Sequence, residues 1–201
     1  MTGFQNIGII ILAAGGSARL GQPKQLLPYA GTTLLQHAIH AATESVADYV
    51  IVVVGSRADE ISKAIEPGKA VIVVNTNWQE GMASSIRCGI NELIKDCPQT
   101  NGVLLMLCDQ PHVTAALLND LITAHQNTGK PIVASNYNGA VGAPALFHKS
   151  IFPKLLQLKG DIGARSVIQR HDKDVAVVAF SKGNVDIDTA ADYEALRQVS
   201  E

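Results

Sequence analysis

Short apolar runs alternate with helix-like segments over the first two thirds of this chain. The runs are rich in Ile, Leu and Val, which is typical of strands buried on both faces of a parallel sheet. They lie at residues 7–12, 49–54, 71–74, 103–107 and 132–134. Because parallel neighbours need a crossover connection, this alternation predicts a doubly wound, mostly parallel α/β sheet.

Helices are expected between these strands, at residues 34–43, 57–65, 83–95 and 115–127. Thr114 is placed to cap the last of them, and Ser56-x-x-Asp59 has the spacing of a capping box at the second. These signals predict where two of the crossover helices begin.

The pattern changes after Ser135. Residues 136–144 are rich in Asn and Gly, a loop is expected at 160–163, and short strands are expected at 175–179 and 185–187. Thr189-x-x-Asp192 predicts the cap of a closing helix that ends near Val199. Since no linker, repeat or low-complexity tract divides the chain, we expect one domain over residues 1–201, with a core in 1–135 and an edge region in 136–201.

Charge and cysteine content exclude several classes of protein. A formal net charge of -2 gives no basic footprint for nucleic acid. The three cysteines form no C-x-x-C pair, which favours a reduced cytoplasmic setting over a disulfide framework or a zinc site. No apolar stretch approaches the roughly 20 residues of a membrane span. We therefore expect a cytoplasmic protein that binds neither nucleic acid nor membrane.

A glycine-rich loop follows the first predicted strand, at the edge where open α/β sheets bind ligands. Its small residues allow backbone N–H groups to approach phosphate oxygens, while cationic side chains supply positive charge. Its residues are Leu12, Ala13, Ala14, Gly15, Gly16 and Ser17, followed by Arg19 and Lys24. The loop is neither a Walker A motif nor a G-x-G-x-x-G fingerprint. It predicts a phosphate site; a strand-to-helix turn with surface cations is the alternative.

Carboxylates occur at two places that suit a metal ion. Asp109 follows the predicted strand 103–107, and Mg²⁺ is commonly held by one or two carboxylates together with substrate phosphates. A turn-initiating Asp is the alternative there. Asp186 and Asp188 would share one side of the predicted strand 185–187, so one or both complete the metal site in this interpretation. Helix capping by Asp188 and simple exposure of Asp186 are the alternatives.

Taken together and in order, the motifs of this chain resemble those of the MobA-like nucleotidyltransferases, in particular the molybdenum cofactor cytidylyltransferases. They are LAAGGSARLGQPKQLLPYAG, NTNWQEGMASSIRCGI, CDQP, GAPALF, GDIGAR and DIDTAADY. The resemblance implies a Rossmann-like, nucleotide-diphospho-sugar transferase-like fold. It also implies Mg²⁺-dependent transfer of CMP from CTP to the terminal phosphate of molybdopterin carrying molybdenum, with release of pyrophosphate. The Leu-Ala-Ala-Gly form of the loop is associated with cytidine in that family, so Ala14 favours CTP.

The resemblance also assigns roles to residues of this chain. The backbone of residues 13–16 would contact base and ribose, Arg19 and Lys24 the triphosphate, and Asp109 the magnesium ion. Arg19, Lys24 and Asp109 would be the catalytic residues. The nucleotide pocket would be bordered by Asn75, Ser84 and Ser85, and the acceptor by Gly142, Pro144, Asp161, Gly163 and Arg165. Two departures, Thr76 for Pro and Ala190-Ala191 for Pro-Glu, touch no candidate catalytic group.

The resemblance therefore divides the chain into a nucleotide-binding core in 1–135 and an acceptor-side region in 136–201. A molybdoenzyme or its maturation chaperone is the protein partner that such an activity implies. A related transferase with another nucleoside triphosphate or a sugar-phosphate acceptor is the alternative within this class. A noncatalytic protein that binds or delivers molybdenum cofactor is the alternative from another class.

Overall fold

A seven-stranded sheet forms the centre of the computed structural model, which describes residues 6–17 and 19–199. The strands run in the order β5-β4-β1-β6-β8-β7-β9. Their bounds are β1 (Ile7–Ala13), β4 (Tyr49–Val54), β5 (Val71–Val74), β6 (Gly102–Leu107), β7 (Ile132–Tyr137), β8 (Ala140–His148) and β9 (Val175–Ala179). Only β8 is antiparallel to its neighbours, β6 and β7. The predicted mostly parallel α/β sheet is confirmed.

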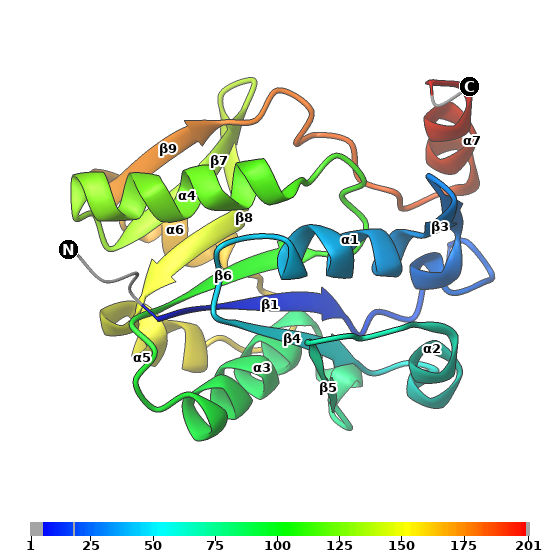
Figure 1. The fold of residues 1–201 in the computed structure, drawn as a ribbon, viewed down its shortest axis with the longest axis horizontal. Helices are drawn as coiled ribbons and strands as arrows, with labels where there is room; N and C mark the ends of the chain where they lie inside the picture. Colours follow the sequence, from blue (N-terminus) through cyan, green and yellow to red (C-terminus); the bar gives the residue numbers. More distant parts are fainter. Residues whose placement is uncertain (1–5, 18, 200–201) are drawn as a thin grey trace.

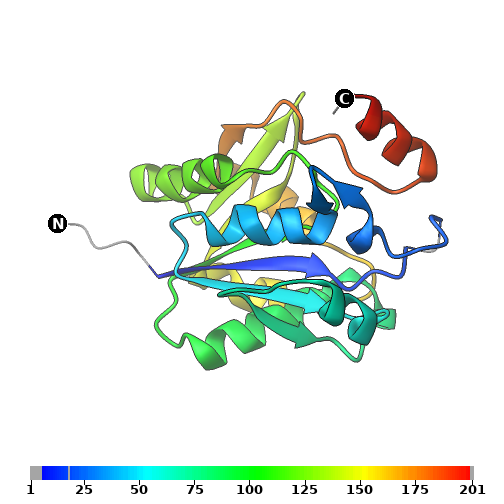
Figure 2. The ribbon, with the colours of Figure 1, turned by 45° about the vertical axis from the view of Figure 1, so that its right-hand side comes forward.

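Helices cover both faces of the sheet (Figures 1 and 2). One face carries α1 (Leu34–Thr43), α2 (Ala58–Ala64) and α4 (Ala115–Thr128), whose apolar side chains join one core cluster. The other face carries α3 (Met82–Asp96), α5 (Phe152–Leu156) and α6 (Arg165–Arg170). Along β1, Ile9 and Ile11 enter the first cluster while Ile10 enters the second, because successive strand residues point to opposite faces.

A smaller layer closes the edge where β1 and β6 end. The two-stranded hairpin of β2 (Pro28–Tyr29) and β3 (Thr32–Thr33) lies beside α7 (Ala190–Val199), as Figure 1 shows. Leu196 of α7 packs with Ile187, Leu27 and Leu34 in a third cluster. The last part of the chain is thereby held against the segment that follows the glycine loop.

Two capping predictions are confirmed and one is wrong. Thr114 accepts a hydrogen bond from Leu117 N at 3.3 Å, and Asp192 Oδ2 accepts one from Thr189 N at 2.8 Å. At α2, however, Arg57 stands at the cap with φ 53° and makes no side-chain cap bond. Ser56 N instead donates to Ala14 O at 3.1 Å, which ties this turn to the glycine loop.

The region after Ser135 differs from its prediction. The expected loop at 160–163 is present. Residues 136–144 belong to a hairpin that was not predicted: β7 and β8 extend through them, and the turn residues Asn138 and Gly139 have φ 54° and 84°. Asn and Gly tolerate such positive φ values, which the two-residue hairpin turn requires. The predicted strand 185–187 is absent, since these residues lie in irregular backbone. The short helices α5 and α6 were not predicted.

The described residues also include four short 3-10 helices, η1 (Lys24–Leu26), η2 (Trp78–Glu80), η3 (Lys149–Ile151) and η4 (Asp172–Asp174). Among residues 6–17 and 19–199, no helix is long and apolar enough to cross a membrane.

Candidate active site

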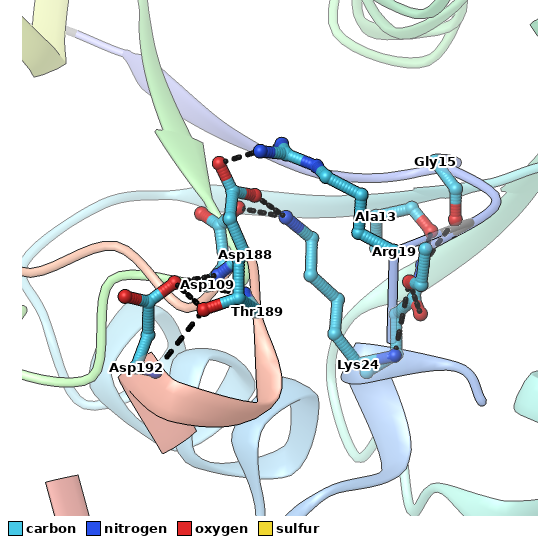
Figure 3. A network of polar contacts seen from close by, with 10 residues as sticks. Ala13, Gly15, Arg19, Lys24, Asp109, Asp188, Thr189 and Asp192 are labelled. Carbon is cyan, nitrogen blue, oxygen red and sulfur yellow. Dashed lines mark hydrogen bonds and ion pairs between the residues drawn. The ribbon is translucent and has the colours of Figure 1, made fainter. Parts of the chain in front are cut away.

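An ion-pair cluster lies at the ends of β1 and β6 (Figure 3). Lys24 Nζ, from η1, donates to Asp109 Oδ2 and to Asp188 Oδ1, the latter at 2.9 Å. Arg19 joins the cluster through Asp188 Oδ2 at 3.0 Å. The side chains of Lys24 and Asp109 are only 15% and 12% exposed. The fold therefore brings together a buried cation and two carboxylates that are far apart in sequence.

Mutual pairing keeps Lys24 and Asp188 charged. Burial by itself would lower the pKa of Lys24, but the charge of Asp109 and the hydrogen bonds to Asp109 and Asp188 raise it overall. The hydrogen bond from Lys24 lowers the pKa of Asp188, although burial acts in the opposite direction. At neutral pH Lys24 is thus an ammonium group and Asp188 a carboxylate.

Gln25 holds the glycine loop in place from within the protein. Its side chain is 1% exposed, and Nε2 donates to Ala13 O at 2.7 Å and to Gly15 O at 2.9 Å. In a trans peptide the N–H points away from the carbonyl, so the N–H groups of Ala14 and Gly16 face away from Gln25. Neither amide donates to any residue that the structure describes. The loop therefore keeps free donors for a ligand.

Sequence reasoning missed Gln25, because a glutamine in a polar stretch carries no sign of its burial. Replacing it with leucine is expected to leave two loop carbonyls without a donor. The carbonyl of Ala13 is buried, and an unpaired buried carbonyl costs about 1–3 kcal/mol, so the melting temperature should fall by several degrees. Because the loop is then held less firmly, the KM for the nucleotide should rise about tenfold. Melting curves and steady-state kinetics measure both effects. A Gln126→Leu variant, on the exposed surface of α4, is the control. If the KM for the nucleotide is the same in Gln25→Leu as in the wild type, Gln25 does not position the loop.

A first cavity of about 450 Å³ opens beside this loop. It is lined by residues 12–16, 24–25, 78–82, 85, 107–109 and 161. Of the predicted nucleotide-binding residues, Leu12, Ala13, Ala14, Gly15, Gly16, Lys24 and Ser85 lie in its wall. Ser17, Arg19, Asn75 and Ser84 do not line it.

Two of these non-lining residues support the wall from behind. Asn75 is buried, and its Nδ2 donates to Ser84 Oγ at 2.8 Å and to Ser85 Oγ at 3.0 Å. Ser17 Oγ accepts from Lys24 N at 3.0 Å, which fixes the start of η1 against the loop. Asn75 therefore holds the first turn of α3, and Ser17 holds the segment that carries Lys24.

Gly55 allows Trp78 to lie against the glycine loop. A Cβ at this position would be 2.6 Å from Trp78 Cβ and 2.8 Å from Ala14 Cβ, distances that packed atoms do not reach. With glycine there, the Trp78 ring approaches Gly16 and forms part of the cavity wall. Gly55 was also missed by sequence reasoning, since the contact joins segments that are not adjacent in the chain.

A second cavity of about 290 Å³ adjoins the first. The two share Leu12, Met82, Leu107 and Asp161 as lining residues. Of the predicted acceptor-binding residues, Gly142, Asp161, Gly163 and Arg165 lie in the wall of the second cavity. Pro144 does not; it is buried in β8, and its carbonyl accepts from Ser135 Oγ at 2.8 Å. The molecule thus offers two neighbouring compartments at one edge of its sheet.

The comparisons with known proteins agree with this arrangement. Residues 9–175 match the MobA-like NTP transferase domain. The chain belongs to the MobA-like NTP transferase family. As a nucleotidyltransferase of this family, it has a nucleoside triphosphate as substrate, which suits a cavity walled by a glycine loop and a buried lysine.

Relatives of this MobA-like transferase carry different names. It is 27% identical to purine catabolism protein PucB of Bacillus subtilis, over 94% of this chain and 95% of the relative. It is 28% identical to nicotine blue oxidoreductase of Paenarthrobacter nicotinovorans, over 94% of this chain and 93% of the relative. These two relatives therefore do not point to one common acceptor.

A solved relative shares the whole fold. The crystal structure of Rv0371c from Mycobacterium tuberculosis H37Rv matches with a TM-score of 0.86 at 32% identity, over 97% of this chain and 99% of that one. A further structure of Rv0371c is a complex with manganese and matches with a TM-score of 0.81 at 30% identity, over 96% of this chain and 99% of that one. This solved relative therefore binds a divalent metal ion.

One atom of this transferase fits a metal ion. Asp109 Oδ1 is buried and accepts no hydrogen bond from any residue in the described part of the chain. Within residues 6–17 and 19–199, no three His, Cys, Asp or Glu side chains are grouped so as to hold a metal by themselves. Mg²⁺ usually takes only one or two carboxylates together with substrate phosphates. The free oxygen of Asp109 fits this requirement, and Mg²⁺ binding there stays a prediction.

The structure separates the two C-terminal carboxylates that the sequence pattern had placed together. Asp188 pairs with Lys24 and Arg19, whereas Asp186 lies in the wall of the second cavity. The prediction that both carboxylates point to the same side of a strand is wrong, because no strand forms there. Burial, with the charges of Asp109 and Asp188, raises the pKa of Asp186 to about 6, although a hydrogen bond from Gln110 acts in the opposite direction.

The raised pKa of Asp186 predicts a pH-dependent stability difference. An acid whose folded pKa lies above its usual 3.8 stabilises the fold at low pH, and that stability is lost as pH rises through about 6. An Asp186→Asn variant should therefore gain stability relative to the wild type between pH 4 and 7. Thermal melting without divalent cations measures the difference. Asp188→Asn is the control of opposite sign, since the pKa of Asp188 is lowered; a pH-independent difference for Asp186→Asn would contradict the prediction.

Proposed function

We propose that this transferase moves CMP from CTP to the terminal phosphate of a molybdopterin-type acceptor and releases pyrophosphate. The observation that carries the proposal is the pair of adjoining cavities with the Lys24 cluster beside the first. The first has free loop amides and a buried cation, which suit a triphosphate. The second has Arg165 in its wall, whose guanidinium suits a phosphate monoester.

The choice of CTP rests on the loop. Ala14 is 5% exposed, and its carbonyl is held by Ser56 N, so the second small residue of the Leu-Ala-Ala-Gly segment has a fixed backbone. Resemblance to the cytidine-using members of the family supports cytidine as the base that this backbone contacts. In this proposal, main-chain groups of the loop recognise the base, and Trp78 lines the same cavity.

The reaction needs alignment and charge compensation more than a strong base. An oxygen of the acceptor phosphate, already ionised, forms the new bond to the α-phosphorus, while the bond from that phosphorus to the pyrophosphate oxygen breaks. The pyrophosphate leaves with the electron pair, and no covalent enzyme intermediate forms. Lys24 and Arg19 would offset the negative charge that collects on the α-phosphate and the leaving group.

Mg²⁺ held by Asp109, with Asp188 as the second carboxylate, would add positive charge beside the phosphates. Asp188 suits that task better than Asp186, because it already shares Lys24 with Asp109. Lys24 in turn would exchange one of its carboxylate partners for a phosphate oxygen when the nucleotide enters.

A scan of nucleotides tests the proposal. Purified protein with molybdopterin carrying molybdenum is incubated with CTP, GTP, ATP or UTP in the presence of Mg²⁺, and pyrophosphate release is measured. We expect CTP to support the fastest release. Inactivity with CTP would reject the cytidylyl assignment, and activity with a sugar phosphate in place of molybdopterin would favour the alternative transferase. In the same proposal, the cofactor product passes to a molybdoenzyme or to its maturation chaperone.

A further inference from the structure

The irregular segment 157–164, which joins α5 to α6, lies against the first turn of α3. Two N–H groups at the start of α3 donate to this bridging segment: Ala83 N to Gly160 O at 3.1 Å, and Met82 N to Asp161 Oδ1 at 3.3 Å. The first N–H groups of a helix have no acceptor within the helix itself. The bridging segment therefore supplies acceptors that α3 lacks.

Gly81 allows the bridging segment to approach α3 closely. A Cβ at Gly81 would lie 2.6 Å from the C and O atoms of Gly160 and from Asp161 N, distances that packed atoms do not reach. Its φ of 100° is also a value that favours glycine. Because backbone lies against backbone here, no rotation of a side chain relieves the fit. The bridging segment thus has one close-fitting position on α3.

The contact between the bridging segment and α3 forms the boundary between the two cavities. Met82 and Asp161, which meet in this contact, lie in the walls of both cavities. Of their neighbours, Gly81 lines only the first cavity and Gly163 only the second. A displacement of the bridging segment along α3 would therefore move one wall of the second cavity relative to the first.

Arg87 fastens the bridging segment to α3 from outside both cavities. It lies one turn further along α3 and is in the wall of neither cavity. Its Nη1 donates to Leu158 O at 2.7 Å, and its Nη2 donates to Glu80 Oε2 at 2.7 Å. The side chain is only 27% exposed. Because the guanidinium is planar and rigid, it holds the bridging segment and η2 at a fixed separation.

We propose that Arg87 is a positioning residue, which fixes the second cavity relative to the first by tying the bridging segment to α3. The inference rests on the proposed function in that the first cavity holds the nucleotide and the second the acceptor. Transfer needs the attacking oxygen in line with the α-phosphorus, and a misplacement of about 1 Å can cost about a hundredfold in rate. Loss of Arg87 should therefore act on kcat.

Hydrogen exchange tests this tether without any substrate. Arg87→Leu leaves the Leu158 carbonyl without its donor, so the bridging segment should leave α3 more often and free the Ala83 N–H. We expect the Ala83 amide, followed by NMR, to exchange about tenfold faster or more in Arg87→Leu. The Asn75 amide, which donates to Val54 O at 2.8 Å, should exchange at the wild-type rate.

Steady-state kinetics tests the effect on transfer. In pyrophosphate release from CTP with molybdopterin carrying molybdenum, Arg87→Leu should lower kcat about tenfold or more. The KM for CTP should stay within about twofold, because Lys24 and the glycine loop keep their own contacts. An unchanged stoichiometry of nucleotide binding in calorimetry would show that the folded fraction has not fallen. If the wild type prefers GTP, ATP or UTP, that nucleotide replaces CTP.

Arg170→Leu, at an exposed position at the end of α6, is the matched control and should change neither measurement. If Arg87→Leu does not fold, Arg87→Lys takes its place, since an ammonium group lacks the planar fork that holds two acceptors at once. The inference is overturned if the variant leaves either the Ala83 exchange rate or kcat at the wild-type value.

Failure of the proposed function would look different. It would appear in the wild type, as no pyrophosphate release from CTP, while Ala83 exchange still responded to Arg87→Leu. A wild type that is active with CTP, with an Arg87→Leu variant of equal kcat, would uphold the cytidylyl assignment and reject the positioning role of Arg87.

Discussion

Lys24→Ala is expected to lower the kcat of nucleotidyl transfer by about a hundredfold to a thousandfold. The Lys24 ammonium lies in the wall of the first cavity beside the free amides of the glycine loop, so its loss removes charge where it collects in the transition state. The effect should fall on kcat and on kcat/KM together, since an interaction made mainly in the transition state is removed. Steady-state pyrophosphate release measures both constants.

The same variant has a second readout in stability. Without Lys24, Asp109 loses its ion-pair partner, and breaking a largely buried pair costs about 3–5 kcal/mol. The pair with the partly exposed Asp188 adds little. We expect a lower melting temperature, with a far-UV circular dichroism spectrum that is unchanged at about room temperature. Lys149→Ala, at an exposed position on η3, is the matched control. Wild-type kinetics in Lys24→Ala would refute the assigned role.

Asp109→Asn is expected to lower kcat by about a hundredfold or more. The substitution keeps the size of the side chain but removes the charge, and a bound metal ion supplies several kcal/mol of transition-state stabilisation. Binding of Mn²⁺ in the presence of CTP, followed by electron paramagnetic resonance, should weaken in parallel. The pKa of Asp186 should also fall from about 6, because Asp109 is one of the charges that raise it.

Asp59→Asn, on the exposed surface of α2, is the control for Asp109→Asn. Retained transfer activity in Asp109→Asn would remove Asp109 from the chemistry and would favour a protein that only binds or delivers cofactor. Loss of activity with unchanged Mn²⁺ binding would instead mean that Asp109 acts through Lys24.

Much of the fold could be predicted from the local sequence pattern, and the errors of that prediction have identifiable causes. The apolar runs at 7–12, 49–54, 71–74 and 103–107 all form strands of the sheet. The antiparallel hairpin of β7 and β8 was hidden, because its Asn- and Gly-rich turn looks like a loop when its partner strands are unknown. The alternation at 185–187 predicted a strand, but only Ile187 needs burial there, and it packs against Leu27, Leu34 and Leu196 instead of a sheet neighbour.

The sequence by itself determined that a glycine loop and Asp109 lie at one edge of a parallel sheet. Apolar runs must be buried, and the carboxyl ends of parallel strands meet at the same edge. Only the tertiary structure decided which groups touch there. Lys24 pairs with Asp188, 164 residues away, and Gln25 turns inward to hold the loop that precedes it. No local period records such contacts, because long-range packing sets them. For the same reason, only the fold revealed that Asp186 faces a second, apolar cavity.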